Sequence, residues 1–575
     1  MAIITKTRIL LVNPPRKILF PRTPYARWFP LGLAYVAASC RENGFDVQVY
    51  DAMSHAGRIA SVGGDESSAL AERPGTSALY ELGARWDKLR EVLFTEQPDI
   101  VGITFPCAAH RSEAVRATEI AKDALPDCVT VAGGPDVTSS WGSVMANDVV
   151  DFGIRGDGEL PFKALLESLI SGGGLAGIDG LVYRIGAEVR ENGRAVSSSD
   201  LLDSIIPAYD LFPMERWFAL SDMRFAMLTT SRGCASSCAY CSQASTRYRA
   251  RHVDSVVNEI RYMIDKYDID TLLIEDDSLL ARRGNALRLF ESIAEIDREL
   301  AIHCMAGVSA SAIDQTMARA MKGAGVRTVA FGVETFDAES LAKVNKPPPS
   351  ENHACEAVRV SREAGIEDTR LFFIAGLPGS TLDKCLADIE RAYALGARVN
   401  LNFLYPIEGT PLFEDSAAAS VVSKAPEAFR SAFVNLSRNG FSRDEGILLI
   451  DSYHALKELT NHRNLDKCLQ AHGVSRRENG EVDVYLLTVD RHDWRLKGGD
   501  KGDGKLCSHF ANRLADWFSI AGEALYMCRE KSCRMAKRSG ACEFELREVA
   551  RLDDTKARII ESLRRCYRLY KGALS

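Results

Sequence analysis

Three cysteines at short spacing are the residues of this chain best suited to chemistry. They lie in Thr229-Thr-Ser-Arg-Gly-Cys234-Ala-Ser-Ser-Cys238-Ala-Tyr-Cys241-Ser, with the spacing C-x3-C-x2-C. Thiolates are soft ligands, and in a reducing compartment they favour an iron–sulfur cluster. A cubane cluster needs four ligands, so a loop that supplies three leaves one iron open to a substrate or cofactor. The spacing therefore predicts a catalytic metal centre with Cys234, Cys238 and Cys241 as ligands.

A zinc knuckle and three unrelated buried thiols are the alternatives. Zinc sites normally close with a fourth Cys or His at short spacing, and none follows Cys241 before His252. The chain has 15 cysteines, an odd number, and several stand alone in apolar segments. This usage is typical of a reducing cytoplasm and not of a secreted disulfide framework.

The elements that position the cysteines alternate between strands and helices. Phe225-Ala-Met-Leu-Thr-Thr230 leads directly into the loop. Further strands are expected near 271–274, 302–305, 328–332, 371–374 and 399–403, with helices near 253–266, 285–300, 311–323, 351–364 and 382–395. Six β/α units are fewer than the usual eight, so we expect an open, partial (β/α)6 barrel of TIM type. Loops at the carboxyl ends of barrel strands carry active sites, and the cysteines lie on one of them.

An earlier region shows a second alternation of the same kind. Apolar strands are expected at 8–13, 46–50, 100–104, 129–132 and 150–154, with helices near 31–43, 79–94, 112–124, 140–147 and 160–171. This order predicts a doubly wound, Rossmann-like α/β domain that binds its ligand at the carboxyl ends of the strands. Small or flexible residues stand at those ends: Thr104, Gly133, Gly134, Gly156 and Gly158. Glycine lets a bulky ligand approach the backbone closely, although tight turns alone also use glycine.

Composition restricts the remaining possibilities. Lys and Arg number 71 and Asp and Glu 78, a net charge of −7 without long blocks of one sign, which argues against a nucleic-acid partner. The sequence contains no run of 18 apolar residues, which a membrane span would need, and its N-terminus lacks a signal-peptide core. We therefore expect a cytoplasmic protein. We expect domains at 1–196 and 225–415, a linker at 197–224, and a mainly helical C-terminal domain at 416–575. The possible soft ligands in that tail fit no zinc spacing well, and their role stays open: Cys507, His509, Cys528, Cys533 and Cys542.

The cysteine loop, with an aromatic Tyr240 before the last cysteine, resembles the signature of the radical S-adenosylmethionine (SAM) superfamily. The resemblance continues along the barrel. It implies SAM contacts from Glu275, Asp276 and Asp277 after the second strand. It also implies contacts from Glu334 in Phe331-Gly-Val-Glu334-Thr and from Gly376 in Phe373-Ile-Ala-Gly-Leu-Pro-Gly379. Their order on successive strands carries more weight than any single motif.

The N-terminal region resembles the cobalamin-binding domain of class B radical SAM enzymes. The glycines at the strand ends, the helix start Pro30-Leu-Gly-Leu-Ala-Tyr35 and the linker 202–211 match that family, and the resemblance covers about residues 5–415. It implies that Thr104, Gly133, Gly134, Gly156 and Gly158 bind cobalamin. One departure concerns the cobalt-ligating motif D-x-H-x-x-G, which is absent after Asn13. His55 follows a different strand at a different spacing, so no protein imidazole is expected below cobalt.

The resemblance implies a cobalamin-dependent radical SAM methyltransferase. Such an enzyme uses methylcobalamin and a 5′-deoxyadenosyl radical to methylate an unactivated carbon, with a [4Fe–4S] cluster and SAM as further cofactors. We expect a small-molecule or peptide substrate, by family analogy a secondary metabolite, and an electron donor such as flavodoxin or ferredoxin. A non-methylating relative that performs oxidative cyclisation or rearrangement, and a corrinoid- or SAM-binding sensor without turnover, are the alternatives. No catalytic side chain is assigned.

Overall fold

The computed structural model describes most of the chain up to residue 414 and shorter stretches beyond it. The described residues are 7–18, 29–55, 59–62, 79–346, 351–414, 449, 453, 469–475, 484–490, 520–521, 524–530, 541–542, 544–551, 562, 565–566 and 569. Two compact units divide the chain. The first holds Met1–Thr328, Val344–Lys346 and Tyr405–Val434, and the second holds Val329–Lys343, Pro347–Leu404 and Asn435–Ser575.

A sheet of seven strands begins the first unit, in the order β10-β9-β8-β7-β6-β1-β3. The five strands from β8 to β3 are parallel, and the β9–β10 hairpin adds an antiparallel edge. The strands are β1 Arg8–Asn13, β3 Asp46–Asp51, β6 Ile100–Thr104, β7 Val129–Gly133, β8 Phe152–Ile154, β9 Leu181–Ile185 and β10 Glu188–Glu191. This confirms the predicted doubly wound sheet.

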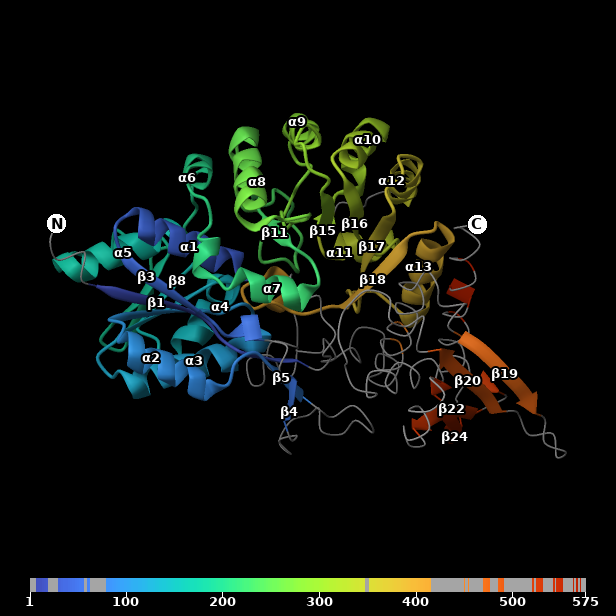
Figure 1. Ribbon diagram of the computed structural model, residues 1–575, viewed down its shortest axis with the longest axis horizontal. Coiled ribbons are helices and arrows are strands. Elements are labelled where there is room, and N and C mark those ends of the chain that lie inside the picture. Colours follow the sequence, from blue (N-terminus) through green and yellow to red (C-terminus); the bar gives the residue numbers. More distant parts are fainter. Residues whose placement is uncertain are drawn as a thin grey trace. The chain divides into compact units, whose positions relative to one another are not determined.

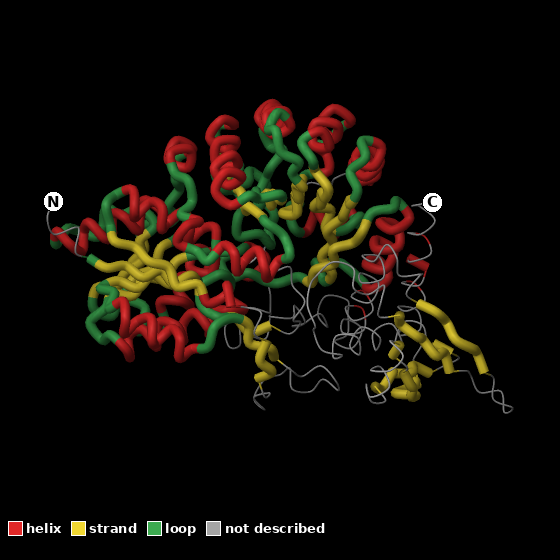
Figure 2. The backbone as a smooth tube through the Cα atoms, viewed as in Figure 1, coloured by secondary structure: helices red, strands yellow, loops and turns green. Residues whose placement is uncertain are grey.

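Helices cover both faces of this sheet (Figure 2). They are α1 Leu31–Glu42, α2 Trp86–Glu96, α3 Arg111–Ala124, α4 Pro135–Met145 and α5 Glu159–Ser171. Helices α1 and α5 pack together on one face, and α2 and α3 pack together on the other (Figure 1). Because both faces are covered, a strand such as β1 is apolar almost throughout, and Ile9–Val12 are buried.

One expected helix in this region is shorter than predicted. Residues Leu79–Leu82 form strand β5, which lies between β2 Arg16–Ile18 and β4 Ile59–Val62 in a small antiparallel sheet. Helix α2 begins only at Trp86. Gly83, with a φ of +114°, separates the two elements, and this backbone conformation interrupts a helix.

The segment between the two sheets is ordered and buries aromatic rings. It contains α6 Ser199–Ser204 and α7 Met214–Ser221. Phe29, just before α1, stacks on Tyr209 at 5.6 Å between ring centroids and meets Trp217 edge-on at 5.8 Å. Phe29 also meets Phe225 of the next strand at 6.2 Å. Aromatic packing therefore fixes this segment against the start of the second sheet.

The second sheet has six strands in chain order, β11-β14-β15-β16-β17-β18. They are β11 Phe225–Leu228, β14 Thr271–Ile274, β15 Ala301–Val308, β16 Val326–Glu334, β17 Asp368–Ala375 and β18 Arg398–Phe403. In the first unit, the helices α8 Val253–Tyr267, α9 Arg283–Ala294 and α10 Gln315–Gly323 pack in succession outside their strands. In the second unit, α12 Glu351–Glu363 contacts β17, and α13 Leu382–Ala394 contacts β17 and β18. The predicted partial barrel of six units is confirmed.

The expectation of a mainly helical C-terminal domain is wrong for the residues that the structure describes there. They are chiefly strands: β19 Leu469–Ser475, β20 Val484–Asp490, β21 Ile520–Ala521, β22 Ala524–Glu530, β23 Ala541–Cys542 and β24 Phe544–Arg551. They form two antiparallel sheets, β19-β20-β23 and β21-β22-β24. Runs such as Val484-Tyr-Leu-Leu-Thr-Val-Asp490 are rich in residues that favour strands. Cys507, His509 and Cys533 lie outside the described residues, while Cys528 and Cys542 lie on β22 and β23.

The expected domain boundaries stay a prediction. Within the described part of the chain, no helix combines the length and the apolar character needed to cross a bilayer.

Candidate functional site

The cysteine loop is closed at its base by two short strands. β12 Ser231–Arg232 pairs with β13 Arg249–Ala250, and residues 233–248 form the loop between them. Inside the loop, the backbone N–H of Cys234 donates to Thr246 Oγ1 at 2.9 Å, and the N–H of Thr246 returns a bond to the Cys234 carbonyl at 2.9 Å. The N–H of Cys241 donates to the Cys238 carbonyl at 3.1 Å. These bonds fix the backbone of the loop that carries the three cysteines.

All three thiols are outside any disulfide. The Cys241 sulfur accepts the backbone N–H of Gln243 at 3.4 Å, a contact that suits a thiolate. Burial raises the pKa of Cys241, and the nearby thiols of Cys238 and Cys234 raise it further. Burial and the neighbouring thiols both disfavour a free thiolate at Cys241. Binding a metal relieves this cost because it stabilises the deprotonated sulfur.

Gly233 makes the entry to the loop possible. Its φ is +85°, and a Cβ built there would lie 2.2 Å from the Arg247 carbonyl oxygen. The residue immediately before Cys234 must therefore lack a side chain. Its N–H donates to the Asp277 carboxylate at 3.0 Å, which ties the loop to the end of β14.

The three adjacent acids after β14 have different roles in the fold. Asp276 is buried, and its carboxylate accepts the Thr230 N–H at 2.6 Å and the Ser231 hydroxyl at 2.7 Å. Burial raises the pKa of Asp276 to about 6, although these hydrogen bonds favour the ionised form. Asp276 therefore anchors the start of the cysteine loop, and it is not part of the cavity wall described below. Its expected contact with SAM stays a prediction.

Glu275 and Asp277, on either side of Asp276, line a cavity of about 530 Å³ in the first unit. Asp276, by contrast, does not belong to the wall of this cavity. Burial raises the pKa of Asp277, while the Gly233 N–H and the charge of Arg194 lower it. Two of the three predicted acids thus face the same space.

The strand ends of the N-terminal sheet line this same cavity. All five predicted residues belong to its wall: Thr104, Gly133, Gly134, Gly156 and Gly158. A Cβ on Gly134 would lie 2.8 Å from the Phe105 carbonyl oxygen, and one on Gly156 would lie 2.1 Å from the Ala195 carbonyl oxygen. Both have positive φ, so the backbone itself forms the surface at these points. Gly233, Gln243 and Thr246 of the cysteine loop lie on the wall as well.

The remaining predicted residues belong to the second unit. Glu334 ends β16, is buried, and has a φ of +65°, an uncommon value for a residue with a side chain. Its neighbour Thr335 donates its hydroxyl to Asp388 at 2.6 Å, and the Phe336 N–H donates to the same carboxylate at 3.1 Å. Asp388 therefore fixes the turn that follows Glu334. Gly376, directly after β17, has a φ of +86°.

The loop histidine does not line the cavity. His55 lies next to Asp51, Nδ1 is 3.2 Å from the Ser54 hydroxyl, and Nε2 contacts Arg216. Burial lowers the pKa of His55, and the charge of Arg216 lowers it further. Asp51 accepts the Asn13 amide at 2.8 Å and the Trp217 indole N–H at 2.7 Å. This segment therefore joins the end of β1 to α7.

Several wall residues escaped the sequence analysis, among them Arg16, Arg194 and Arg232. Arg232 precedes Gly233 in the cysteine segment, and its proximity to the loop was a usable signal. No signal in the sequence marks Arg16 or Arg194, because each follows an ordinary strand and only the fold brings it to the cavity.

Two family models match these regions. The radical SAM superfamily matches residues 228–392, and the B12 binding domain matches residues 22–166. An uncharacterized methyltransferase of Pyrococcus horikoshii, PH0819, is 30% identical over 72% of this chain and 84% of its own length. This chain belongs to the cobalamin-dependent radical SAM methyltransferase family.

Two other relatives extend the comparison for this member of the family. The cytidylyl-2-hydroxyethylphosphonate methyltransferase of Streptomyces wedmorensis is 24% identical over 74% of this chain and 84% of the relative. The structure of the radical SAM methyltransferase TsrM from Kitasatospora setae, with cobalamin and a [4Fe-4S] cluster bound, superimposes with a TM-score of 0.56. That match covers 72% of this chain and 75% of TsrM at 19% identity, and it shows a shared fold.

Proposed function

We propose that this family member methylates an unactivated carbon of a small molecule, by analogy a secondary metabolite, with a [4Fe–4S] cluster, SAM and cobalamin as cofactors. The observation that carries the proposal is one cavity of about 530 Å³ in the first unit. Its wall contains the glycine-rich strand ends of the N-terminal sheet, the base of the cysteine loop and two acids after β14.

The donor set fits these cofactors. Three thiols outside disulfides on one closed turn suit a cluster with an open iron. On the opposite wall, Gly134 and Gly156 expose backbone where any Cβ would clash. The cavity volume, about 530 Å³, lies within the range of sites for organic ligands.

When bound, the cluster and SAM supply a 5′-deoxyadenosyl radical, and cobalamin supplies a transferable methyl group. The chain's own residues hold and orient these groups. Cys234, Cys238 and Cys241 act as cluster ligands, and Glu275 and Asp277 accept hydrogen bonds from the SAM ammonium. Asp276 keeps the start of the loop in place, because its carboxylate accepts hydrogen bonds from Thr230 and Ser231.

We also propose that Glu334 and Gly376 bind SAM. The strained backbone of Glu334 supports a functional role, because uncommon backbone conformations concentrate at binding sites. Thr104, Gly133, Gly134, Gly156 and Gly158 accommodate cobalamin. A reduced flavodoxin or ferredoxin supplies the electron that the radical chemistry consumes.

Anaerobic reconstitution tests this proposal. Protein loaded with iron, sulfide and hydroxocobalamin is incubated with SAM and dithionite, and 5′-deoxyadenosine and S-adenosylhomocysteine are measured. Both products are expected. Absence of both from protein with full iron and cobalt contents would contradict the enzymatic role and favour a sensor.

Methyl-labelled SAM added to a metabolite extract separates methylation from other radical outcomes. A product that gains the labelled methyl group supports the proposal. A product that loses hydrogen without such a gain supports the non-methylating alternative. That alternative draws on the anaerobic magnesium-protoporphyrin IX monomethyl ester cyclase of Rubrivivax gelatinosus, which is 26% identical over 62% of this chain.

A further inference from the structure

Three arginines flank the cysteine loop, and each lies at or beside one of the strands that close it. Arg232 is the last residue of β12, Arg249 is the first of β13, and Arg251 follows β13 directly. All three side chains are at most 17% exposed. We call them the arginine clasp. Guanidinium groups this deeply buried need partners for their charge, and the partners define what the clasp joins.

Arg232 binds the loop that follows β8 of the N-terminal sheet. Its guanidinium donates to Glu159 at 2.8 Å and lies 3.2 Å from Asp157. It also lies over the ring of Tyr35 in α1, 4.8 Å from the centroid. Burial disfavours the charge, but Glu159 and Asp157 outweigh it and raise the pKa of Arg232. Arg232 therefore stays charged and held on three sides.

Arg249 binds the same acidic loop, with Nη2 3.0 Å from Asp157. Asp157 thus takes one arginine from each of the two strands that close the cysteine loop. Its carboxylate also accepts the Ser197 N–H at 2.7 Å. In a second contact the arginine comes from the N-terminal region and the acceptors come from the cysteine loop. Arg194 donates to the Ser242 carbonyl at 3.2 Å and to the Gln243 side chain at 2.8 Å.

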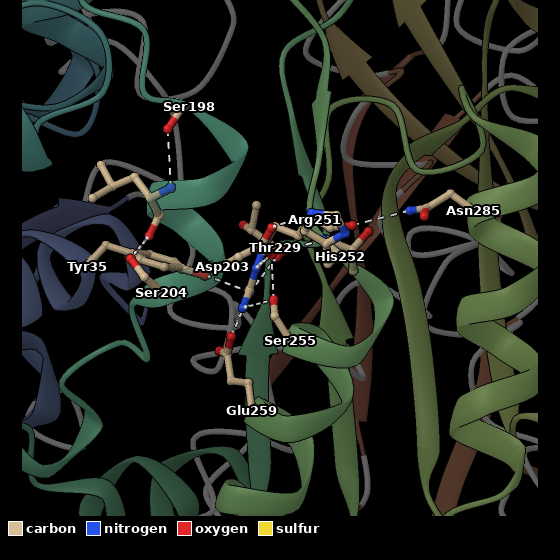
Figure 3. Close-up of polar contacts among 12 residues, drawn as sticks. Tyr35, Ser198, Asp203, Ser204, Thr229, Arg251, His252, Ser255, Glu259 and Asn285 are labelled. Atoms are coloured by element: carbon tan, nitrogen blue, oxygen red, sulfur yellow. Dashed lines mark hydrogen bonds and ion pairs between the residues drawn. The ribbon is translucent and has the colours of Figure 1, made fainter.

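Arg251 completes the clasp from the barrel side (Figure 3). Its Nη1 donates to Glu259 at 2.6 Å, to the Thr229 carbonyl at 3.0 Å and to the Tyr35 hydroxyl at 3.0 Å. Tyr35 therefore contacts two of the three arginines, one through its ring and one through its hydroxyl. The charge of Glu259, itself fully buried, keeps the pKa of Arg251 raised although burial lowers it.

The acidic partners lie next to cavity-lining glycines. Asp157 stands between Gly156 and Gly158, and Glu159 begins α5. Asp157 and Glu159 themselves line the cavity, as does Arg232. Residues 156–159 thus include two glycines of one wall and the two carboxylates that bind arginines at the base of the cysteine loop. Removing one partner of a buried charge pair is strongly destabilising. These pairs therefore hold the base of the cysteine loop firmly against Asp157 and Glu159.

We infer that the arginine clasp is a positioning device that sets the distance and orientation between the cysteine loop and the Gly156–Gly158 surface. The inference rests on the proposed function, in which these two walls hold the cluster with SAM and cobalamin. Methyl transfer to cobalt depends on alignment across the cavity, whereas SAM cleavage at the cluster depends on the cysteine loop and the SAM-binding residues and does not involve the Gly156–Gly158 surface. Asp157 is the node of the clasp because it meets two of its arginines.

Asp157→Asn tests the inference, with Glu215→Gln as the matched control. Glu215 also forms a two-point pair with an arginine, Arg224, but the pair is exposed and joins α7 to the residue before β11. Reconstituted holoenzyme is analysed for iron, cobalt, 5′-deoxyadenosine and S-adenosylhomocysteine, and hydrogen exchange of residues 233–248 is followed by mass spectrometry.

In Asp157→Asn, iron and cobalt contents should match wild type. Exchange in 233–248 should be about tenfold faster, because the loop base loses a paired charge. The ratio of 5′-deoxyadenosine to S-adenosylhomocysteine should rise about tenfold, since a small misplacement of reacting groups costs rate steeply. A general loss of stability would lower both products together. Glu215→Gln should leave ratio and exchange unchanged.

Arg232→Lys provides a second variant should Asp157→Asn be insoluble. It keeps the charge but loses the planar fork and the stacking on Tyr35, so an intermediate change of ratio and exchange is expected. The inference would be overturned if a soluble variant matched the control in two quantities. These are the ratio of 5′-deoxyadenosine to S-adenosylhomocysteine and the hydrogen-exchange rate of residues 233–248. If wild type itself forms neither product, the proposed function fails, and the exchange rates alone then decide whether the clasp holds the loop.

Discussion

The two walls of the cavity are built in different ways. On the side of the N-terminal sheet, the surface is backbone: Gly134 and Gly156 have positive φ and stand where a Cβ would lie within 3 Å of a carbonyl oxygen. On the side of the cysteine loop, the surface depends on side-chain carboxylates that bind the backbone. Asp276 bonds Thr230 and Ser231, and Asp277 bonds Gly233.

This difference determines how each wall responds to substitution. The glycine wall is damaged by added atoms, because the neighbouring backbone cannot move aside cheaply. The loop wall is damaged by removed atoms, because a missing carboxylate leaves buried donors without partners. Substitutions of opposite kinds should therefore affect different cofactors.

Cys238→Ala should have the largest effect, since it removes a proposed ligand from the loop wall. Iron–sulfur absorbance and 5′-deoxyadenosine formation should be lost, while cobalamin still binds to the glycine wall. Visible spectra and iron and cobalt analysis measure both. Cys355→Ala, a partly exposed thiol on α12, is the control and should retain both cofactors. A full iron complement in Cys238→Ala would contradict the ligand assignment.

Gly156→Ala makes the converse change. The added methyl group would meet the Ala195 carbonyl oxygen at 2.1 Å in a residue with a φ of +90°. Hydroxocobalamin affinity, measured by visible titration, should fall about tenfold or more, because the wall must shift. Gly142→Ala is the matched control: this glycine lies in α4, and its Cβ would meet no atom within 4 Å. Equal affinity in both variants would remove Gly156 from the cobalamin wall.

The sequence could predict the glycine wall more completely than the loop wall. Glycines at strand ends are a local signal, and all five predicted residues line the cavity. The three acids after β14 looked alike in the sequence, yet only the fold decides that Asp276 turns inward and Glu275 and Asp277 outward. The arginine clasp depends on pairs 73 and 92 residues apart, which no local pattern reveals. The C-terminal strands were missed because their alternation is irregular, with a register shift after Leu525.

Glu334→Gln extends the comparison to the second unit. Loss of one hydrogen bond that involves a charged group costs about 1.5–3 kcal/mol, so SAM affinity should fall about tenfold to a hundredfold. Iron content should not change. Calorimetric titration of anaerobic protein with SAM measures the affinity. Glu339→Gln changes an exposed acid that pairs with Lys343 on α11 (Ala338–Lys343), and this variant should bind SAM as wild type does. An unchanged affinity in Glu334→Gln would assign this residue a structural role.

Asp276 should give the loop wall a pH dependence. Burial raises its pKa in the folded state to about 6, above the ordinary aspartate value of 3.8, so the folded state binds the proton more tightly than the unfolded chain. The resulting stabilisation is fully present below pH 3.8 and is lost as the pH rises through 6. The shift of about two pH units corresponds to roughly 3 kcal/mol. Between pH 4.5 and 7.5, the melting temperature of wild type should therefore fall relative to that of Asp276→Asn. A constant difference between the two proteins across this range would contradict the assignment.

His55→Ala should have the smallest effect, because His55 belongs to neither wall. The described cavity wall does not include this residue, and its ring nitrogens already contact Ser54 and Arg216. Bound cob(II)alamin should therefore show no superhyperfine splitting from a protein nitrogen in its electron paramagnetic resonance spectrum. His55→Ala should leave that spectrum and the cobalt content unchanged. The cofactor's own base is also expected to be displaced, which leaves cobalt without a lower nitrogen donor and favours the reduced, nucleophilic form that accepts a methyl group. Splitting that is present in wild type and vanishes in His55→Ala would show that the Asp51–His55 segment reaches cobalt. Splitting that persists in the variant would point instead to the cofactor's own base.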